Sequence, residues 1–91
     1  MNNTTTTSNT KLTFKSALLT ACRNSYWEDR NIKLIVNDKN GIEIMDVNMK
    51  SLRNTENKVE VSQKLYWDTV TFDVSLDDVI EYQYKGRSRK K

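Results

Sequence analysis

The 91-residue sequence contains no histidine and no proline, a single cysteine and only two glycines. Because histidine is the commonest general base and metal ligand near neutral pH, its absence removes the usual centre of acid–base or metal chemistry. Cys22 has neither a second cysteine nor a histidine to pair with, which excludes an internal disulfide and a structural zinc site. Two separated glycines exclude the common glycine-rich phosphate loops. The sequence therefore predicts a non-enzymatic protein without a cofactor or a metal.

Long apolar runs are also missing. No stretch approaches the roughly 18 apolar residues that span a bilayer, so no membrane partner is expected. Residues 1–10 consist almost entirely of Thr, Asn and Ser; they lack the pattern of a secretory signal and are predicted to be a disordered N-terminal tail. With a lone cysteine, these features favour a reducing compartment.

The net charge of +3 is unevenly distributed along the chain. All of the basic excess lies at residues 85–91, and residues 1–84 carry slightly more acidic than basic groups. Residues 86–91 are therefore treated as a basic C-terminal tail. One hypothesis is nucleic-acid binding or nuclear import, and the other is a solvated end without a function of its own. The candidate cations are Lys85, Arg87, Arg89, Lys90 and Lys91.

One domain is predicted at residues 11–85, and it begins with a helix at residues 12–27. Thr13 is the expected N-cap. The apolar residues then recur at the spacing of one helix face: Phe14, Ala17, Leu18, Ala21 and Cys22. Cys22 is thus interpreted as a small core residue, because no histidine is available to activate a thiol.

Five short segments come next in which apolar and polar residues alternate, as in half-buried strands. They lie at residues 32–37, 42–49, 59–62, 69–74 and 79–84. Turns are predicted at 37–41, where Gly41 can take a positive φ, at 51–58, at 64–68, and at 75–78 as a turn or a single 3₁₀ turn. In the second strand the apolar parity changes between Ile44 and Met45, which predicts a β-bulge there.

These elements predict a mainly β fold with one N-terminal helix. The connections are too short for crossover helices, so the sheet is expected to be antiparallel. Five strands with a bent second strand and a single turn before the last indicate an Sm-like (SH3-like), strongly bent small barrel. An OB-type barrel fits less well, because it usually places a helix between its third and fourth strands.

Two other groups of residues are candidates for chemistry or binding. Asp77 and Asp78 are adjacent, so on a strand they would point to opposite faces, and a turn is the better interpretation than an acid–base pair. The aromatic residues could stack nucleic-acid bases, but packing in the core or at an interface is the stronger expectation. They are Tyr26, Trp27, Tyr66, Trp67, Tyr82 and Tyr84.

Strand edges are the strongest candidate for function. The last two predicted strands are apolar and aromatic, and proline is absent, so nothing blocks pairing with a neighbouring chain. Sm-like proteins pair the fourth strand of one subunit with the fifth strand of the next. The last strand is expected to be an edge of the sheet. Val79→Pro or Gln83→Pro is therefore expected to remove an edge donor and to break pairing with the partner. The predicted interface residues are Val70, Phe72, Val74, Val79, Ile80, Tyr82, Gln83 and Tyr84.

The base-binding motifs of Sm-like proteins are degenerate here. The segment Asp46-Val47-Asn48-Met49 only approximates the expected Asp-x-x-Met-Asn motif. An Arg-Gly is expected before the fifth strand, but the chain has Leu76-Asp77-Asp78-Val79. This argues against an ordinary RNA-binding ring, and direct RNA binding is expected to be weak or absent.

The sequence resembles the Gemin seven family, an Sm-like subunit of the survival-of-motor-neuron complex. Leu12 to Ala21 is similar to the leading helix of that family, and Val61-Ser62-Gln63 matches a Val-Ser-Gln in its third strand. Asp78 to Lys85 is similar to its closing Asp-Ile-Ile-x-Tyr-x-Phe-Lys. The chain departs from the family at residues 37–41, in the proline-free turn at 64–68, and in its basic tail.

The resemblance implies a non-catalytic scaffold. Such a subunit forms a heterodimer with a Gemin six-like Sm-like partner, contacts a Gemin eight-like subunit, and acts in the cytoplasm and nucleus. The complex loads Sm proteins onto spliceosomal small nuclear RNAs, so Sm proteins are indirect partners. Two alternatives remain: a small Sm-like RNA-binding protein that uses the basic tail, and a phage or bacterial inhibitor with an Sm-like fold.

Overall fold

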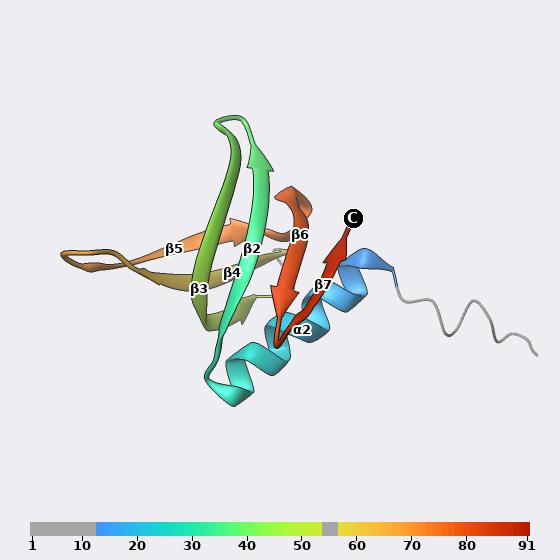
Figure 1. The fold of residues 1–91 in the computed structure, drawn as a ribbon, viewed down its shortest axis with the longest axis horizontal. Helices are drawn as coiled ribbons and strands as arrows, with labels where there is room; N and C mark the ends of the chain where they lie inside the picture. Colours follow the sequence, from blue (N-terminus) through green and yellow to red (C-terminus); the bar gives the residue numbers. More distant parts are fainter. Residues whose placement is uncertain (1–12, 54–56) are drawn as a thin grey trace, which may run out of the picture.

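The computed structural model describes residues 13–53 and 57–91. One helix is followed by a single antiparallel sheet, and a short 3₁₀ turn, η2 (Leu76–Asp78), precedes the fifth of its six strands (Figure 1). The elements before η2 are α2 (Phe14–Glu28), β2 (Asn31–Asp38), β3 (Gly41–Arg53), β4 (Lys58–Lys64) and β5 (Thr69–Ser75). Those after it are β6 (Val79–Tyr84) and β7 (Arg87–Lys90). The strand order in the sheet is β5-β4-β3-β2-β6-β7.

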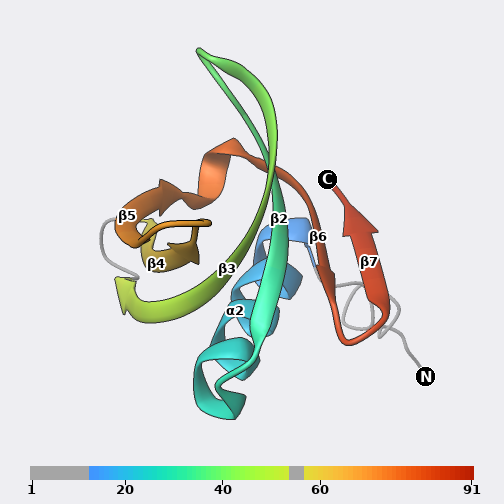
Figure 2. The same ribbon diagram turned by 60° about the vertical axis from the view of Figure 1, so that its left-hand side comes forward.

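Helix α2 begins and ends at well-defined caps. The Thr13 side chain accepts a hydrogen bond from the backbone N–H of Ser16 at 3.1 Å, which confirms the predicted N-cap. The helix ends at Asp29, whose left-handed backbone (φ 53°) directs its N–H to the carbonyls of Ser25 and Tyr26. The apolar face of the helix belongs to the same core cluster as the buried strand residues, and the helix runs behind β2 in the view of Figure 2.

Strands β2 and β3 form a hairpin whose turn was predicted correctly. Gly41 takes a φ of 103°, and the Asn40 N–H is bound by the Asp38 side chain at 2.8 Å. The predicted bulge was wrong in its position. Ile42 and Ile44 lie on the outer face of the sheet, where they are 67% and 65% exposed. The register with β2 is continuous here, and the first residue of β3 that faces the core is Met45.

The register irregularity in β3 instead lies between Met49 and Ser51, where β3 pairs with β4. An extra residue at this point bends the strand. β3 curves so far that β4 and β5 run across the direction of β2 (Figure 1). The polar turn predicted at 51–58 is shorter than expected, because β3 continues to Arg53 and β4 begins at Lys58; residues 54–56, like the predicted tail at 1–10, lie outside the described residues.

The largest difference from the sequence prediction is a sixth strand. Lys85 and Gly86 have φ angles of 52° and 79°, which is the two-residue turn that reverses a β-hairpin tightly. The chain therefore turns back, and β7 pairs with β6 from Tyr84↔Arg87 to Glu81↔Lys90. Because β6 now has β2 on one side and β7 on the other, it has no free edge for β5, and hydrogen bonds do not close the sheet into a barrel.

The core lies between α2 and the concave face of the bent sheet. Its largest fully buried side chains come from five of the elements: Leu18, Cys22, Ile32, Leu34, Val47, Val59, Val61 and Val79. Cys22 is completely buried, as predicted, and this burial raises the pKa of its thiol to about 12. The thiol is therefore a packing group rather than a nucleophile.

Candidate interaction surfaces

The outer edge of β5 has no partner strand among the described residues. At one end of the β4–β5 ladder, the Leu65 N–H donates to the Asp68 carbonyl (2.6 Å); at the other, the Leu76 N–H donates to the Asn57 carbonyl (3.0 Å). Antiparallel ladders alternate between hydrogen-bonded and non-bonded pairs. Counting from either end directs the N–H and C=O groups of four residues away from β4: Thr69, Thr71, Asp73 and Ser75.

This edge lacks the usual protection against pairing. It is seven residues long, contains no proline or lysine, and carries Asp73 as its single charge. On its core-facing side, Val74 is buried, Phe72 is half-buried and Val70 is 36% exposed. The edge thus offers four outward backbone positions beside an apolar row that becomes more exposed toward the hairpin tip.

Two aromatic residues mark the tip of the β4–β5 hairpin. Tyr66 and Trp67 are 99% and 80% exposed, and their rings meet edge to face with centroids 6.5 Å apart. The hairpin extends away from the rest of the sheet (Figure 1). Packing in this chain's own core, one of the two expectations for these rings, is therefore wrong for this pair. Large exposed aromatic rings next to an open strand edge favour protein contacts.

The expectation that β6 is an edge strand was also wrong. Val79 and Tyr84 are buried, Ile80 and Tyr82 are half-buried, and Gln83 pairs with Lys33 of β2 on one side and Ser88 of β7 on the other. The backbone N–H and C=O groups of β6 thus pair with β2 and β7 within the sheet. Of the two edges predicted to pair with a neighbour, the structure leaves only that of β5 open.

The edge that replaces β6 is short and cationic. The Lys91 N–H donates to the Ile80 carbonyl at 2.8 Å, and the same alternation then directs only the Ser88 and Lys90 backbone groups outward. Cationic side chains on a short edge strand are a common protection against pairing. The two ends of the sheet are therefore unlike: β5 is open and β7 is protected.

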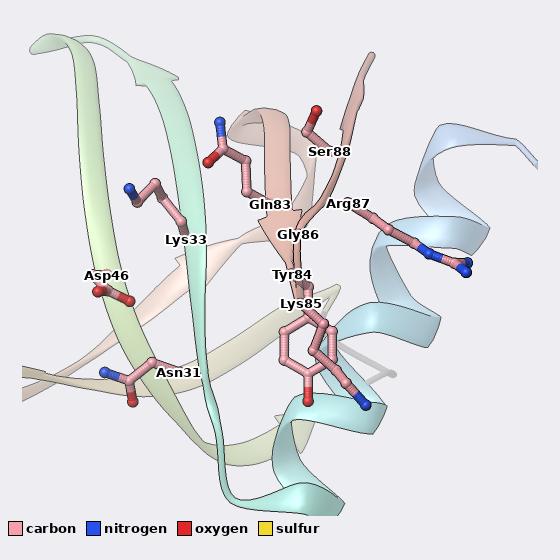
Figure 3. Close-up of a pocket in the computed structure, with 9 residues that line it drawn as sticks. All are labelled: Asn31, Lys33, Asp46, Gln83, Tyr84, Lys85, Gly86, Arg87 and Ser88. Atoms are coloured by element: carbon pink, nitrogen blue, oxygen red, sulfur yellow. The ribbon is translucent and has the colours of Figure 1, made fainter.

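The predicted basic tail is thus an ordered part of the sheet. Figure 3 shows Lys85 and Arg87 extending toward α2, whereas Ser88 and Gln83 lie on the opposite side of the β6–β7 hairpin, with Lys33. A shallow polar pocket at this hairpin is lined by the turn residues 84–87 and by Asn31, Lys33, Asp46, Gln83 and Ser88. Asp46 lies opposite Lys33 in the β2–β3 register, which reduces the net charge of this pocket.

The β6–β7 turn is held to the end of α2 by a group of three side chains. The Tyr84 hydroxyl donates a hydrogen bond to the Glu28 carboxylate, and Lys85 Nζ lies 3.4 Å from the same carboxylate. The hydrogen bond from Tyr84, more than the charge of Lys85, lowers the pKa of Glu28. Burial, and then the bond to Glu28, raises the pKa of Tyr84 to about 12.

This contact predicts a specific sensitivity to acid. A carboxyl group whose pKa is lowered in the folded state stabilises the fold above its unfolded pKa, near 4.5, and that stabilisation is lost as pH falls through the lower folded value. The melting temperature of the wild-type chain should therefore fall more steeply than that of Glu28→Gln from about pH 5 to pH 3. Tyr84→Phe, which lacks the donor, should behave like Glu28→Gln. Parallel melting curves for all three chains would contradict the assignment.

The two adjacent aspartates lie in η2, consistent with a turn. Asp77 is 3.2 Å from Lys15 Nζ of α2, and hydrogen bonds from Asn57 and then Lys15 lower its pKa. Within residues 13–53 and 57–91, no group of three potential ligands is placed to hold a metal ion. No helix in the same ranges is long and apolar enough to cross a membrane.

Sequence reasoning missed the β7 hairpin, although one signal was present. Gly86 follows Lys85 directly after an alternating strand, and glycine is favoured at the second position of this two-residue turn. The segment Arg87–Lys90 contains no apolar residue, so it lacks the alternation of apolar and polar residues by which strands are recognised. The outward position of Ile42 and Ile44 was missed for the opposite reason, since apolar residues were assumed to face the core.

Comparison with known proteins adds no relative: no family model matches the sequence, and no curated protein or solved structure matches it at a significant level. The order of elements, a helix followed by a bent antiparallel sheet, is compatible with an Sm-like fold.

Proposed function

We propose that this chain is a non-catalytic, Sm-like interaction subunit that binds another protein by strand addition at the β5 edge. The observation that carries the proposal is the open edge itself, with the outward backbone groups of Thr69, Thr71 and Asp73. In strand addition, main-chain hydrogen bonds supply affinity and pockets for alternate side chains supply specificity. The exposed Tyr66 and Trp67 extend the same surface beyond the end of the strand.

The partner that we propose is a second Sm-like protein, which would present the edge of its last strand. The resemblance to the Gemin seven family sets this pairing within an assembly complex for spliceosomal small nuclear ribonucleoproteins, in the cytoplasm and nucleus. A Gemin six-like protein is the direct partner in that setting, and a Gemin eight-like subunit is a second one. The element order and the open β5 edge support this role; the family assignment rests on the short motifs alone.

A second candidate is direct RNA binding by the basic residues. One observation favours it, because β7 presents its cations on an ordered strand instead of a loose tail. The segment before β6 nevertheless contains Leu76-Asp77-Asp78 where an Sm-like RNA-binding loop needs Arg-Gly, and Asp77 is already paired with Lys15. The strand-addition role is therefore the better supported of the two.

Proline substitutions at the two edges test the proposal. Thr71→Pro removes an outward N–H at the β5 edge, and the matched control Ser88→Pro removes one at the β7 edge. Both positions are exposed edge positions that tolerate proline, so both variants should fold with melting temperatures within about 5 °C of wild type. Tagged chains are cross-linked in cells and purified, and Sm-like and survival-of-motor-neuron components are quantified by mass spectrometry.

Wild type and Ser88→Pro should recover an Sm-like partner in equal amounts, and Thr71→Pro should lose it by about tenfold or more. Equal recovery with Thr71→Pro would show that β5 is not the interface. Recovery of no Sm-like protein by the wild-type chain would remove the proposed function itself.

A further inference from the structure

A hollow of about 280 Å³ opens between α2 and strand β7, far from the β5 edge in the order of the sheet. Thr20 and Asn24 of the helix form one side of this hollow, and Arg87 and Arg89 of β7 form the other. Tyr82, Tyr84 and two alanine side chains of α2 complete the lining. The lining therefore combines apolar and aromatic groups, neutral hydrogen-bonding groups and two guanidinium groups.

Both arginines belong to the same face of β7. They are two residues apart, and they pair in register with Tyr84 and Tyr82, whose side chains also line the hollow. Figure 3 shows Arg87 reaching toward α2 while Ser88 points to the other side. Lys90 has the parity of Ser88, so it carries its charge on the opposite face of the same strand.

None of the described residues that line the hollow is acidic. Glu28, near one end, already accepts a hydrogen bond from Tyr84 and pairs with Lys85. Arg87 makes no ion pair with any carboxylate in the described part of the chain. The positive charge of Arg87, in a concave and partly apolar site without a carboxylate among its described lining residues, favours an anionic ligand.

We propose that this hollow binds an extended acidic peptide segment of a partner protein. One carboxylate of such a peptide pairs with Arg87, and because residues two apart on a strand are separated by roughly 6.6–6.8 Å, the next carboxylate on the same face lies level with Arg89. Guanidinium groups bind carboxylates through two parallel hydrogen bonds. Asn24 and Thr20 supply hydrogen-bonding groups for the peptide backbone.

A peptide fits the hollow better than a nucleic acid does. Binding of single-stranded nucleic acid usually combines cations with aromatic faces on which bases stack. Tyr82 is half-buried here, and its ring packs against Phe14 with centroids 5.9 Å apart. The fully exposed aromatic pair, Tyr66 and Trp67, lies at the β4–β5 tip and does not line this hollow.

Fluorescence anisotropy with a labelled heptapeptide of alternating Glu and Leu tests the site. The matched variants are Arg87→Gln and Lys90→Gln, which remove the same charge from opposite faces of β7. Arg87→Gln should weaken binding by about tenfold, because charge-assisted hydrogen bonds are lost. Lys90→Gln should change it by less than about twofold, since only the long-range field is reduced. Both variants should keep the wild-type melting temperature.

Three results would overturn the proposal. Equal weakening by the two variants would indicate a general electrostatic attraction, and equal binding of a Gln–Leu peptide would show that carboxylates are not recognised. Tighter, Arg87-dependent binding of a hexauridylate would assign the hollow to nucleic acid instead. The assay uses the purified chain without its β5 partner, so failure here is distinct from failure of the proposed function.

Discussion

Gln83→Pro is expected to unfold the domain, not merely to block a partner. Gln83 and Ser88 form a non-bonded pair toward β7, so the Gln83 N–H is directed to β2, inside the sheet. Proline removes that donor and leaves an acceptor on β2 unpaired. The loss is about 3 kcal/mol or more, of roughly 4–11 kcal/mol expected for a domain of this size. Thermal unfolding followed by circular dichroism should show a fall of more than about 12 °C.

Ser88→Pro is the matched control, because Ser88 is the register partner of Gln83 but directs its N–H outward. It should leave the melting temperature nearly unchanged. A folded Gln83→Pro chain with wild-type stability would mean that β6 is an edge after all, and that β7 does not hold its place in the sheet.

Deletion of residues 86–91 is expected to make the chain self-associate more strongly than the full-length chain. Without β7, the backbone groups of Ile80, Tyr82 and Tyr84 that pair with β7 become a free apolar edge. The chain would then expose two different open edges, β5 and β6, which can pair head to tail between copies. Light scattering coupled to gel filtration should show an average mass that rises with concentration to several times that of one chain.

The control keeps the strand and removes its charge: Arg87→Gln, Arg89→Gln and Lys90→Gln combined in the full-length chain. This variant should remain monomeric if backbone pairing, not charge, protects β6. A deletion variant that stays monomeric at high concentration would refute the protective role of β7, and a self-associating glutamine variant would assign that role to the cations.

The local pattern of apolar and polar residues was sufficient to predict the elements that have one apolar and one polar face. Thr13 followed by apolar residues at helical spacing placed α2 within two residues at its start and one at its end. Strict alternation located β5, and the short polar interval after it was correctly limited to η2. In each case the residues that define the element also bury its apolar face, so sequence and packing give the same answer.

The candidate site was harder to predict, because whether a strand lies at the edge of a sheet depends on which other segments of the chain pair with it. Whether β6 is free depends on the segment after it, and β7 contains only cations and serine. Its turn also needs Lys85 in a left-handed conformation, which residues other than glycine rarely adopt and which no composition rule anticipates. Ile42 and Ile44 were assigned to the wrong face for a similar reason. An apolar residue shows a preference for burial, but it does not show which face of the sheet is covered by the rest of the protein.

The unlike ends of the sheet have a consequence for stoichiometry. A subunit with two matching open edges has a valence of two and can propagate a ring or a filament, whereas one open and one protected edge gives a valence of one. When such a subunit adds through β5 to a row of paired strands, its protected β7 edge is at the end of the row, and no further subunit can add there. The six residues after Gln83-Tyr84-Lys85 thereby set an upper limit on how many neighbours this protein can accept through its sheet.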